Sequence, residues 1–321
     1  MKIRVPEYFR CFLCIADRCE DSCCIGWEID IDRETMEKYA ALGGEIAEKT
    51  RHATFPLDKN GRCAFLDGRG LCRIISEQGE EYLCSICREH PRYYGVGDGY
   101  IDGGIGLGCP EAARMILSLD SLPRLITTER DIPYYDQDPY SATSEAVRDA
   151  LTESIFTLDA RELIGKHLAY ARFADDAAFD VATTGENVRV PRIDYTPCED
   201  KDATRLLSAM LTLLGECEAL TAGWKNTVND ARNVDMKDIG ERVGELRALT
   251  YYFTHRYVRE GVEDMTLGAR VAFAILSALS TVAIGCKTGD LVTAATLYSK
   301  NVEYSTDNVD FILGELDLDN I

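Results

Sequence analysis

The residues best suited to chemistry are cysteines, and they are concentrated in the first third of the chain. The chain has 321 residues, of which 13 are cysteine and only 4 are histidine. Four of the cysteines fall within the single run CIADRCEDSCC at 14–24, and ten of the 13 precede residue 110. Two kinds of structure require thiols at this density: a disulfide framework and a metal site.

The compartment decides between these two structures. The N-terminal stretch MKIRVPEYFRCFLCIAD lacks the apolar run and the small-residue cleavage site of a secretory signal. The longest apolar stretch, 271–286, lies between Arg270 and Lys287 and is shorter than the ~20 residues of a membrane helix, so it predicts a buried helix. We therefore expect a cytoplasmic protein with reduced thiols, and a metal site rather than disulfides.

The cysteine spacing favours an iron–sulfur cluster over a zinc finger. Structural zinc sites commonly contain two Cys-x2-Cys pairs, or a cysteine pair with a histidine pair. The Cys-x2-Cys pairs here are Cys11/Cys14 and Cys84/Cys87, and no histidine stands at finger spacing from either. Iron–sulfur ligation needs only thiolates that converge from loops, which suits the irregular gaps. The loop of radical S-adenosylmethionine enzymes is excluded, because Cys19-x3-Cys23 is followed by glycine at position 26.

The order of the cysteine motifs is more specific than any single gap. The run CIADRCEDSCCIGWEIDID at 14–32 is followed by CAFLDGRGLCRI at 63–74, GEEYLCSICREHPR at 79–92 and CPEAAR at 109–114. Taken together, these motifs resemble the flagellin lysine-N-methylase family and, more distantly, Cys-rich proteins described as zinc- or iron-chelating. The likeness is strong over residues 5–118 and weaker over the helices after 144.

The resemblance implies a cytoplasmic methyltransferase. Such an enzyme carries a [4Fe–4S] cluster and transfers a methyl group from S-adenosylmethionine to lysine ε-amines of a protein, with flagellin or another surface protein as the acceptor. Cys11 and Cys84 fall outside the family pattern, and we expect them to be core thiols. The resemblance implies that the metal ligands come from eight cysteines: Cys14, Cys19, Cys23, Cys24, Cys63, Cys72, Cys87 and Cys109. Which four of the eight bind the cluster stays open.

Two arginines near these cysteines are candidates for cofactor binding. Arg88 and Arg92 flank Cys87 and Pro91. They could offset the negative charge of a cluster, or hold the carboxylate of S-adenosylmethionine by paired N–H bonds. The alternative is surface ion pairing with neighbouring glutamates. Asp102, Glu111 and several tyrosines are candidates for the base that deprotonates the lysine, and the sequence does not rank them, so the catalytic residues stay unassigned.

Hydrophobic patterning predicts a mainly α protein, in which an irregular Cys-rich metal-binding N-terminal region packs on a C-terminal helical bundle. The alternation in 27–32 predicts a strand, and Asp32 is expected to cap a helix that begins near Arg33. A second helix is expected to begin at Pro110, and GGIGLG at 103–108 reads as a flexible turn. The predicted regions are a Cys-rich iron–sulfur region at 1–125, a helical segment at 126–178, a connector at 179–200 and a C-terminal helical bundle at 201–321.

Periodicity places further helices in the C-terminal part. They are expected at 203–221, 236–259, 266–286, 290–303 and from 305–307 onward.

The net charge restricts the partners. The chain carries −20, of which residues 126–321 contribute −15. Phosphate binding is driven by lysine and arginine, so nucleic acid is excluded as a partner, and no membrane segment is expected. An acidic surface favours a lysine-bearing protein substrate. The alternative function is a non-catalytic zinc- or iron-binding module that mediates protein interaction. An electron-transfer protein ranks last, since it has no need of so many helices.

Overall fold

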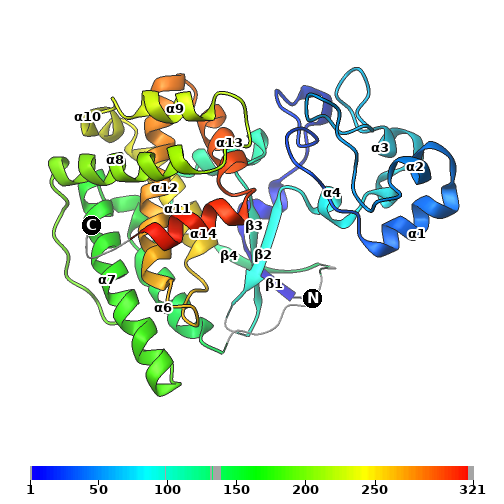
Figure 1. The fold of residues 1–321 in the computed structure, drawn as a ribbon. Coiled ribbons are helices and arrows are strands. Elements are labelled where there is room, and N and C mark those ends of the chain that lie inside the picture. Colours follow the sequence, from blue (N-terminus) through cyan, green and yellow to red (C-terminus); the bar gives the residue numbers. More distant parts are fainter. Residues whose placement is uncertain (1, 98, 131, 133–138, 317–321) are drawn as a thin grey trace.

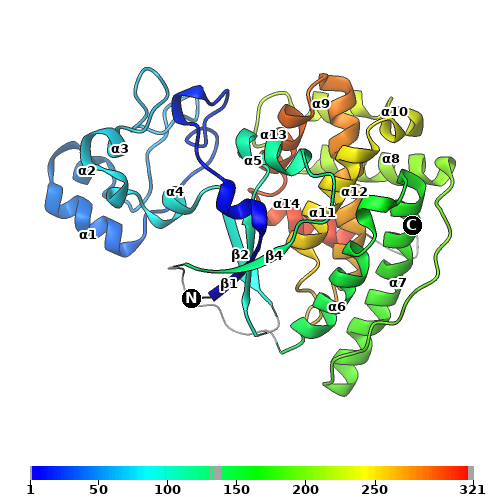
Figure 2. The ribbon, with the colours of Figure 1, turned by 180° about the vertical axis from the view of Figure 1, so that it is seen from behind.

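The computed structural model describes residues 2–97, 99–130, 132 and 139–316. A helical body and a Cys-rich lobe lie on opposite sides of a small β-sheet (Figure 1). The reverse view shows the same order of lobe, sheet and body (Figure 2). The predicted mainly α fold, with an irregular Cys-rich N-terminal region next to a helical bundle, is confirmed.

The elements have the following bounds. The strands are β1 Lys2–Pro6, β2 Arg92–Val96, β3 Ile101–Ile105 and β4 Leu125–Glu129. The short helices of the lobe are α1 Arg33–Leu42, α2 Gly44–Lys49, α3 Arg73–Gln78 and α4 Ser85–Glu89. The helices of the body are α5 Pro110–Leu117, α6 Ser141–Thr152, α7 Ala160–Thr184, α8 Asp200–Glu216, α9 Trp224–Ala231, α10 Met236–Gly240, α11 Val243–Tyr257, α12 Leu267–Thr288, α13 Leu291–Asn301 and α14 Thr306–Glu315. Short 3-10 turns occur at Glu7–Cys11, Ala16–Arg18, Glu80–Tyr82 and Ile155–Thr157.

The sheet has the strand order β2-β3-β1-β4, with β1 parallel to β3 and antiparallel to β4. The chain leaves the sheet after Pro6 and returns to it at Arg92, and the lobe is built from the residues in between. Sequence reasoning missed this sheet, and the predicted flexible turn at 103–108 was wrong in its first half, because Gly103 and Gly104 belong to β3. A Cβ on Gly104 would lie 2.3 Å from the Tyr93 hydroxyl, so the ring packs there only against glycine.

A buried ion pair joins the sheet to the helical body. Asp102 on β3 is fully buried and accepts hydrogen bonds from Arg4 Nε at 3.0 Å and from Arg148 Nη1 at 2.5 Å. Arg4 is the register partner of Asp102 on β1, and Arg148 lies on α6. Burial raises the pKa of Asp102, but the two arginines outweigh it and hold the pKa at about 2. The carboxylate is therefore charged at neutral pH and anchors both elements.

Helix α12 forms the centre of the body and packs against α7, α11 and α13. In the described part of the chain it is the one helix long and apolar enough to cross a membrane, but 89% of its most apolar window is buried inside the protein. The prediction of a buried helix at 271–286 is confirmed.

Local signals were correct at two helix starts and wrong at a strand. The Asp32 side chain accepts a hydrogen bond from the Thr35 backbone N–H at the start of α1, and α5 begins at Pro110, as predicted. Residues 27–32 form no strand and have one isolated bridge, Asp30 to Thr54. The helix predicted at 236–259 is interrupted between Gly240 and Val243.

We expect Asp102→Asn to destabilise the fold by about 3–5 kcal/mol, because Arg148 would stay buried without its carboxylate partner. The folded pKa of about 2 lies below the usual value of about 3.9. The stability from this ion pair is therefore fully present above about pH 4 and is lost as the pH falls toward 2. Urea unfolding as a function of pH measures both effects.

The control is Glu37→Gln, which removes an ion pair to Arg33 whose side chains are 66% and 93% exposed. Exposed pairs of this kind contribute at most a few tenths of a kcal/mol. Equal unfolding midpoints for the two variants would contradict the structural role of Asp102.

Candidate metal centre and the adjoining cavity

The lobe has a small hydrophobic core of its own, separate from the core of the body. Its buried members are Ile29, Ile31, Tyr39, Phe55, Phe65, Ile74 and Cys84. Partly buried cysteines pack against this core, among them Cys63, Cys72 and Cys87. A core of this size stabilises little by itself, so bonds to a metal would add substantially to the stability of the lobe.

Backbone contacts bring five cysteines of the lobe together. The Cys63 backbone N–H donates to the Cys24 carbonyl at 2.9 Å, and Cys72 is bridged to Leu66, three residues after Cys63. The remaining two cysteines stand at the start and in the middle of α4, and their thiols are hydrogen-bonded to each other. The thiols also lie close enough to shift one another's pKa. We call this set the inner thiol group: Cys24, Cys63, Cys72, Cys84 and Cys87.

A second set lies where the lobe meets the body. Cys109 is the residue before α5, and its pKa is affected by Cys19 and Cys23. The segment that carries these two cysteines is held to the body by ion pairs from Glu20 to Arg114 at 2.6 Å and from Asp21 to Lys300 at 2.5 Å. We call Cys19, Cys23 and Cys109 the outer thiol group. The adjacent residues Cys23 and Cys24 join the two groups.

The ionisation of the thiols is set by burial and by thiol–thiol hydrogen bonds. Burial raises the pKa of Cys109 to about 11, although hydrogen bonds from backbone N–H groups at the start of α5 act to lower it. The hydrogen bond from the Cys24 thiol lowers the pKa of Cys23 to about 4, and His90 contributes in the same direction. The same bond raises the pKa of Cys24. Most of these thiols are therefore protonated without a metal, so metal binding must release protons.

The donor set of the lobe consists of thiols, which are ligands for zinc and for iron. All 13 cysteines are free thiols in the structure. Within the residues that the structure describes, no three His, Cys, Asp or Glu side chains are close enough to hold one metal ion. A zinc site needs four ligands around one centre, whereas the thiolates of a cluster bind different iron atoms and stand further apart.

The predicted ligands are distributed over the two groups. Cys24, Cys63, Cys72 and Cys87 lie in the inner group, and Cys19, Cys23 and Cys109 make up the outer group. The eighth, Cys14, is exposed and affects the pKa of Cys19.

Two cysteines were expected to lie outside the site. The prediction that Cys11 is a core thiol was wrong, because the residue is exposed at the end of a 3-10 turn. Cys84 is fully buried, as a core thiol should be, but it also bonds to the thiol of Cys87. The Cys-x2-Cys spacing of 84 and 87 on a helix is the signal that could have placed Cys84 in the site.

A cavity of about 420 Å³ opens beside the thiols, between the lobe and the body. Trp27 lines it and donates from Nε1 to the Cys23 carbonyl at 2.8 Å. The Trp27 ring lies 5.0 Å from the ring of Tyr304, whose hydroxyl is 2.8 Å from His90 Nε2. Aromatic side chains therefore form the wall between the cavity and the thiols. The remaining lining residues are Ser85, Ile86, Glu89, Pro91, Arg92, Tyr93, Tyr94, Gly106 and Arg256.

Two arginines line this cavity, and one of them was predicted. The Nε of Arg92 is buried and has no hydrogen-bond partner among the described residues. Arg88 does not line the cavity; it is 47% exposed and lies 3.9 Å from Glu89. Arg256 was missed by sequence reasoning. Its Nη1 donates to Tyr252 at 2.6 Å and lies 3.3 Å from Glu303, so its charge is already paired.

Comparisons with known proteins agree with the metal-binding character of the lobe. Residues 13–103 match the CxxCxxCC family, described as a putative zinc- or iron-chelating domain. The chain is 29% identical over 127 residues to the flagellar biosynthetic protein FliU of Salmonella muenchen, a match that covers 35% of this chain and 75% of that protein.

The chain is equally similar to two enzymes. It is 29% identical over 127 residues to the lysine-N-methylases of Salmonella typhimurium and Salmonella choleraesuis. Each match covers 35% of this chain but spans only 32% of the enzyme's length. No solved structure matches the chain. The resemblance to the flagellin lysine-N-methylases and to the chelating domain proteins is thereby confirmed.

Serine substitutions test which cysteines belong to the metal site. We expect Cys84→Ser to lower the bound iron of anaerobically reconstituted protein as strongly as Cys87→Ser, because the two thiols are in contact. Cys11→Ser should retain its iron, since that thiol is exposed and lies apart from both groups. Iron per chain measures the effect. Retention of iron in Cys84→Ser together with its loss in Cys11→Ser would exclude the inner group as the ligand set.

Metal removal should loosen the lobe before the body. Because the lobe core is small, we expect chelation of the iron to speed proteolysis between residues 13 and 90, while fragments that contain α7 and α12 persist. Mass spectrometry of the fragments over time measures the order of cleavage. Simultaneous cleavage of lobe and body would show that the two unfold cooperatively.

Proposed function

We propose that this protein is a protein-lysine N-methyltransferase that uses S-adenosylmethionine and whose lobe holds a [4Fe–4S] cluster. The acceptor is a protein with exposed lysines, either flagellin or another surface protein, and the reaction takes place in the cytoplasm. One observation carries the proposal: the lining of the aromatic- and arginine-lined cavity includes Trp27, which donates to the Cys23 carbonyl, and the two residues that follow Cys84 on the chain. The similarity to lysine-N-methylases supports the reaction class.

The cavity has the groups that S-adenosylmethionine requires. Its sulfonium cation would be attracted to the faces of Trp27, Tyr94 and Tyr304. Its carboxylate would accept hydrogen bonds from Arg92, whose Nε is buried without a partner. Arg256 is less available to bind the carboxylate, because its guanidinium already forms an ion pair with Glu303 and a hydrogen bond to Tyr252. Arg92 is therefore our candidate for the cofactor carboxylate.

The acceptor lysine has to lose a proton before it attacks the methyl group. A lysine inserted among aromatic rings loses hydration, which lowers its pKa without a dedicated base. Asp102 is unsuited to the role of base, since two arginines hold its pKa at about 2, and Glu111 is paired with Arg114. Neither residue lines the cavity. Of the candidates that the sequence offered, only tyrosines line the cavity, but burial raises the pKa of each above its usual value, so they stay protonated and the base stays unassigned.

The candidate ligands of the cluster are the two thiol groups. A bound cluster would supply a negatively charged anchor that holds Cys23, and through it Trp27, against the cavity. The acidic surface of residues 126–321 supports a basic acceptor protein, which the net charge of −15 would attract.

A metal-binding module without catalytic activity is the second candidate. The description of the matching family as a zinc- or iron-chelating domain favours it. Such a module would bind metal through the same thiols and would transfer no methyl group.

Incubation of the reconstituted protein with isotope-labelled S-adenosylmethionine and a lysate or purified flagellin separates the two candidates. We expect label on lysine side chains, located by mass spectrometry. Iron-replete protein that labels no lysine and does not bind S-adenosylmethionine would favour the metal-binding module.

Arg92→Ala should weaken S-adenosylmethionine binding by roughly ten-fold or more, because a charge-assisted hydrogen bond contributes about 1.5–3 kcal/mol. Titration calorimetry measures the affinity directly. Arg88→Ala is the matched control and should bind within about two-fold of the unsubstituted protein, since its side chain is outside the cavity. If Arg88→Ala has the larger effect, the cofactor carboxylate lies elsewhere.

A further inference from the structure

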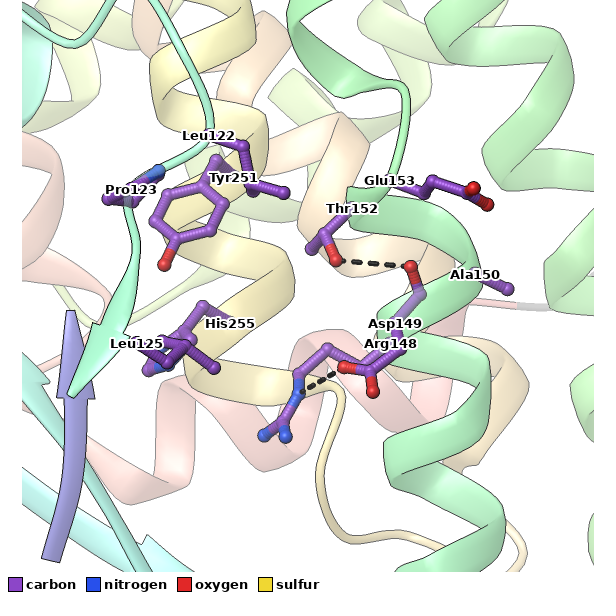
Figure 3. Close-up of a pocket in the computed structure, with 10 residues that line it drawn as sticks. All are labelled: Leu122, Pro123, Leu125, Arg148, Asp149, Ala150, Thr152, Glu153, Tyr251 and His255. Carbon is purple, nitrogen blue, oxygen red and sulfur yellow. Dashed lines mark hydrogen bonds and ion pairs between the residues drawn. The ribbon is translucent and has the colours of Figure 1, made fainter. Parts of the chain in front are cut away.

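A second cavity of about 420 Å³ shares no lining residue with the first. It lies between α6, α11 and the segment that leads into β4 (Figure 3). Leu122, Pro123, Leu125 and Ala150 contribute apolar surface, Asp149 and Thr152 belong to α6, and Glu153 is the residue that follows it. The functional proposal above makes no use of this space.

Two buried aromatic side chains of α11 present unpaired polar atoms to this cavity. Tyr251 and His255 are one helical turn apart, with ring centroids 5.7 Å from each other, and they are 2% and 3% exposed. The Tyr251 hydroxyl and His255 Nε2 are buried and have no hydrogen-bond partner among the described residues. Buried polar atoms in native proteins are nearly always paired, so two unpaired atoms in one cavity require an explanation.

His255 is a donor toward the cavity in the tautomer in which its Nδ1 accepts from Tyr93. Its Nδ1 lies 3.3 Å from the Tyr93 hydroxyl, to which it offers an acceptor. A proton donated by Tyr93 to Nδ1 places the ring's own proton on Nε2. Burial lowers the pKa of His255 to about 3, so the ring is neutral and carries this single N–H. In this tautomer the N–H at Nε2 has no acceptor among the residues that the structure describes.

Arg148 supplies a third donor. Its Nη1 is bonded to Asp102, while Nη2 is buried, forms an ion pair with Glu145 at 3.4 Å and has no hydrogen-bond partner among the described residues. The carboxylate of Glu145 is closer to Arg4, at 2.6 Å. Figure 3 shows the Arg148 guanidinium, the His255 ring and the Tyr251 hydroxyl in the lower part of the cavity, with Leu122 and Pro123 above them.

We propose that this cavity is a binding site for a small monocarboxylate with an apolar body. The carboxylate oxygens accept hydrogen bonds from the Tyr251 hydroxyl, His255 Nε2 and Arg148 Nη2, and the hydrocarbon part contacts Leu122, Leu125 and Ala150. A ligand amine is disfavoured next to these three donors, because an ammonium group is itself a hydrogen-bond donor and its positive charge would be repelled by Arg148. A dicarboxylate or phosphate is disfavoured by the exposed carboxylates of Asp149 and Glu153 at the mouth.

One side chain connects this site to the first cavity. Tyr93, the hydrogen-bond partner of His255, lines the first cavity. The His255 ring thus stands between the two spaces.

The test uses the full chain and three probes of equal chain length. Sodium pentanoate is the monocarboxylate, pentanamide removes its charge, and glutarate adds a second carboxylate. Titration calorimetry should show binding of pentanoate and binding of the other two at least about ten-fold weaker. The same titration of Tyr251→Phe should give an affinity for pentanoate lower by roughly ten-fold. The melting temperature of Tyr251→Phe without ligand should be unchanged, because the removed hydroxyl has no partner among the residues that the structure describes.

Tyr170→Phe is the matched control. It removes the hydroxyl of another buried tyrosine, one that is bonded to the Ile193 backbone outside the cavity, and should leave pentanoate binding unchanged. Absence of pentanoate binding would mean that only water meets the three donors, and would overturn the proposal. Equal affinity for the three probes, or undiminished affinity in Tyr251→Phe, would also overturn it. None of these results bears on the methyl-transfer cavity, whose lining is separate.

Discussion

Asp102 receives hydrogen bonds from two arginines that are far apart in the sequence, and three parts of the molecule meet at this carboxylate. Arg4 lies on β1, before the lobe, and Arg148 lies on α6, in the body. Asp102 itself lies on β3, after the lobe. Because a buried carboxylate without these partners would be strongly destabilised, the ends of the lobe and the first long helix of the body are held in one arrangement. Both cavities are bounded by elements that this ion pair positions.

The helices and their caps were largely predictable, because their signals are local. The Asp32 side chain bonds to a backbone N–H three residues away, and the periodicity of α12 lies within one segment. The sheet was not predictable, since β1 pairs with β3 across nearly a hundred residues and β3 contains two glycines, which are poor strand formers. The alternation in 27–32 did indicate burial correctly, as Ile29 and Ile31 face the core of the lobe. It indicated the wrong element, because no neighbouring strand pairs with it.

In the candidate site, too, local features were predictable and long-range contacts were not. Residue type and motif order pointed to the cysteines, but the division into inner and outer thiol groups depends on loops that bring residue 24 to residue 63. The cavity beside them could not be foreseen. Tyr304 meets His90 across 214 residues, and only the tertiary fold places it there. Arg92 could be named from its position near the motif, whereas Arg256 has no cysteine near it in the sequence.

The position of the lobe between β1 and β2, which lie on either side of β3 in the sheet, has an evolutionary consequence. The matched family region, 13–103, begins soon after β1 and ends within β3, so it coincides with the excursion from the sheet plus the hairpin that closes it. An insertion whose two ends meet the same end of a sheet, here one strand apart, can be inherited as a cassette, because the host needs only to preserve the pairing of the flanking strands. Proteins with different helical bodies could thus share this cysteine cassette, and a match confined to it carries information about the metal chemistry but little about the host.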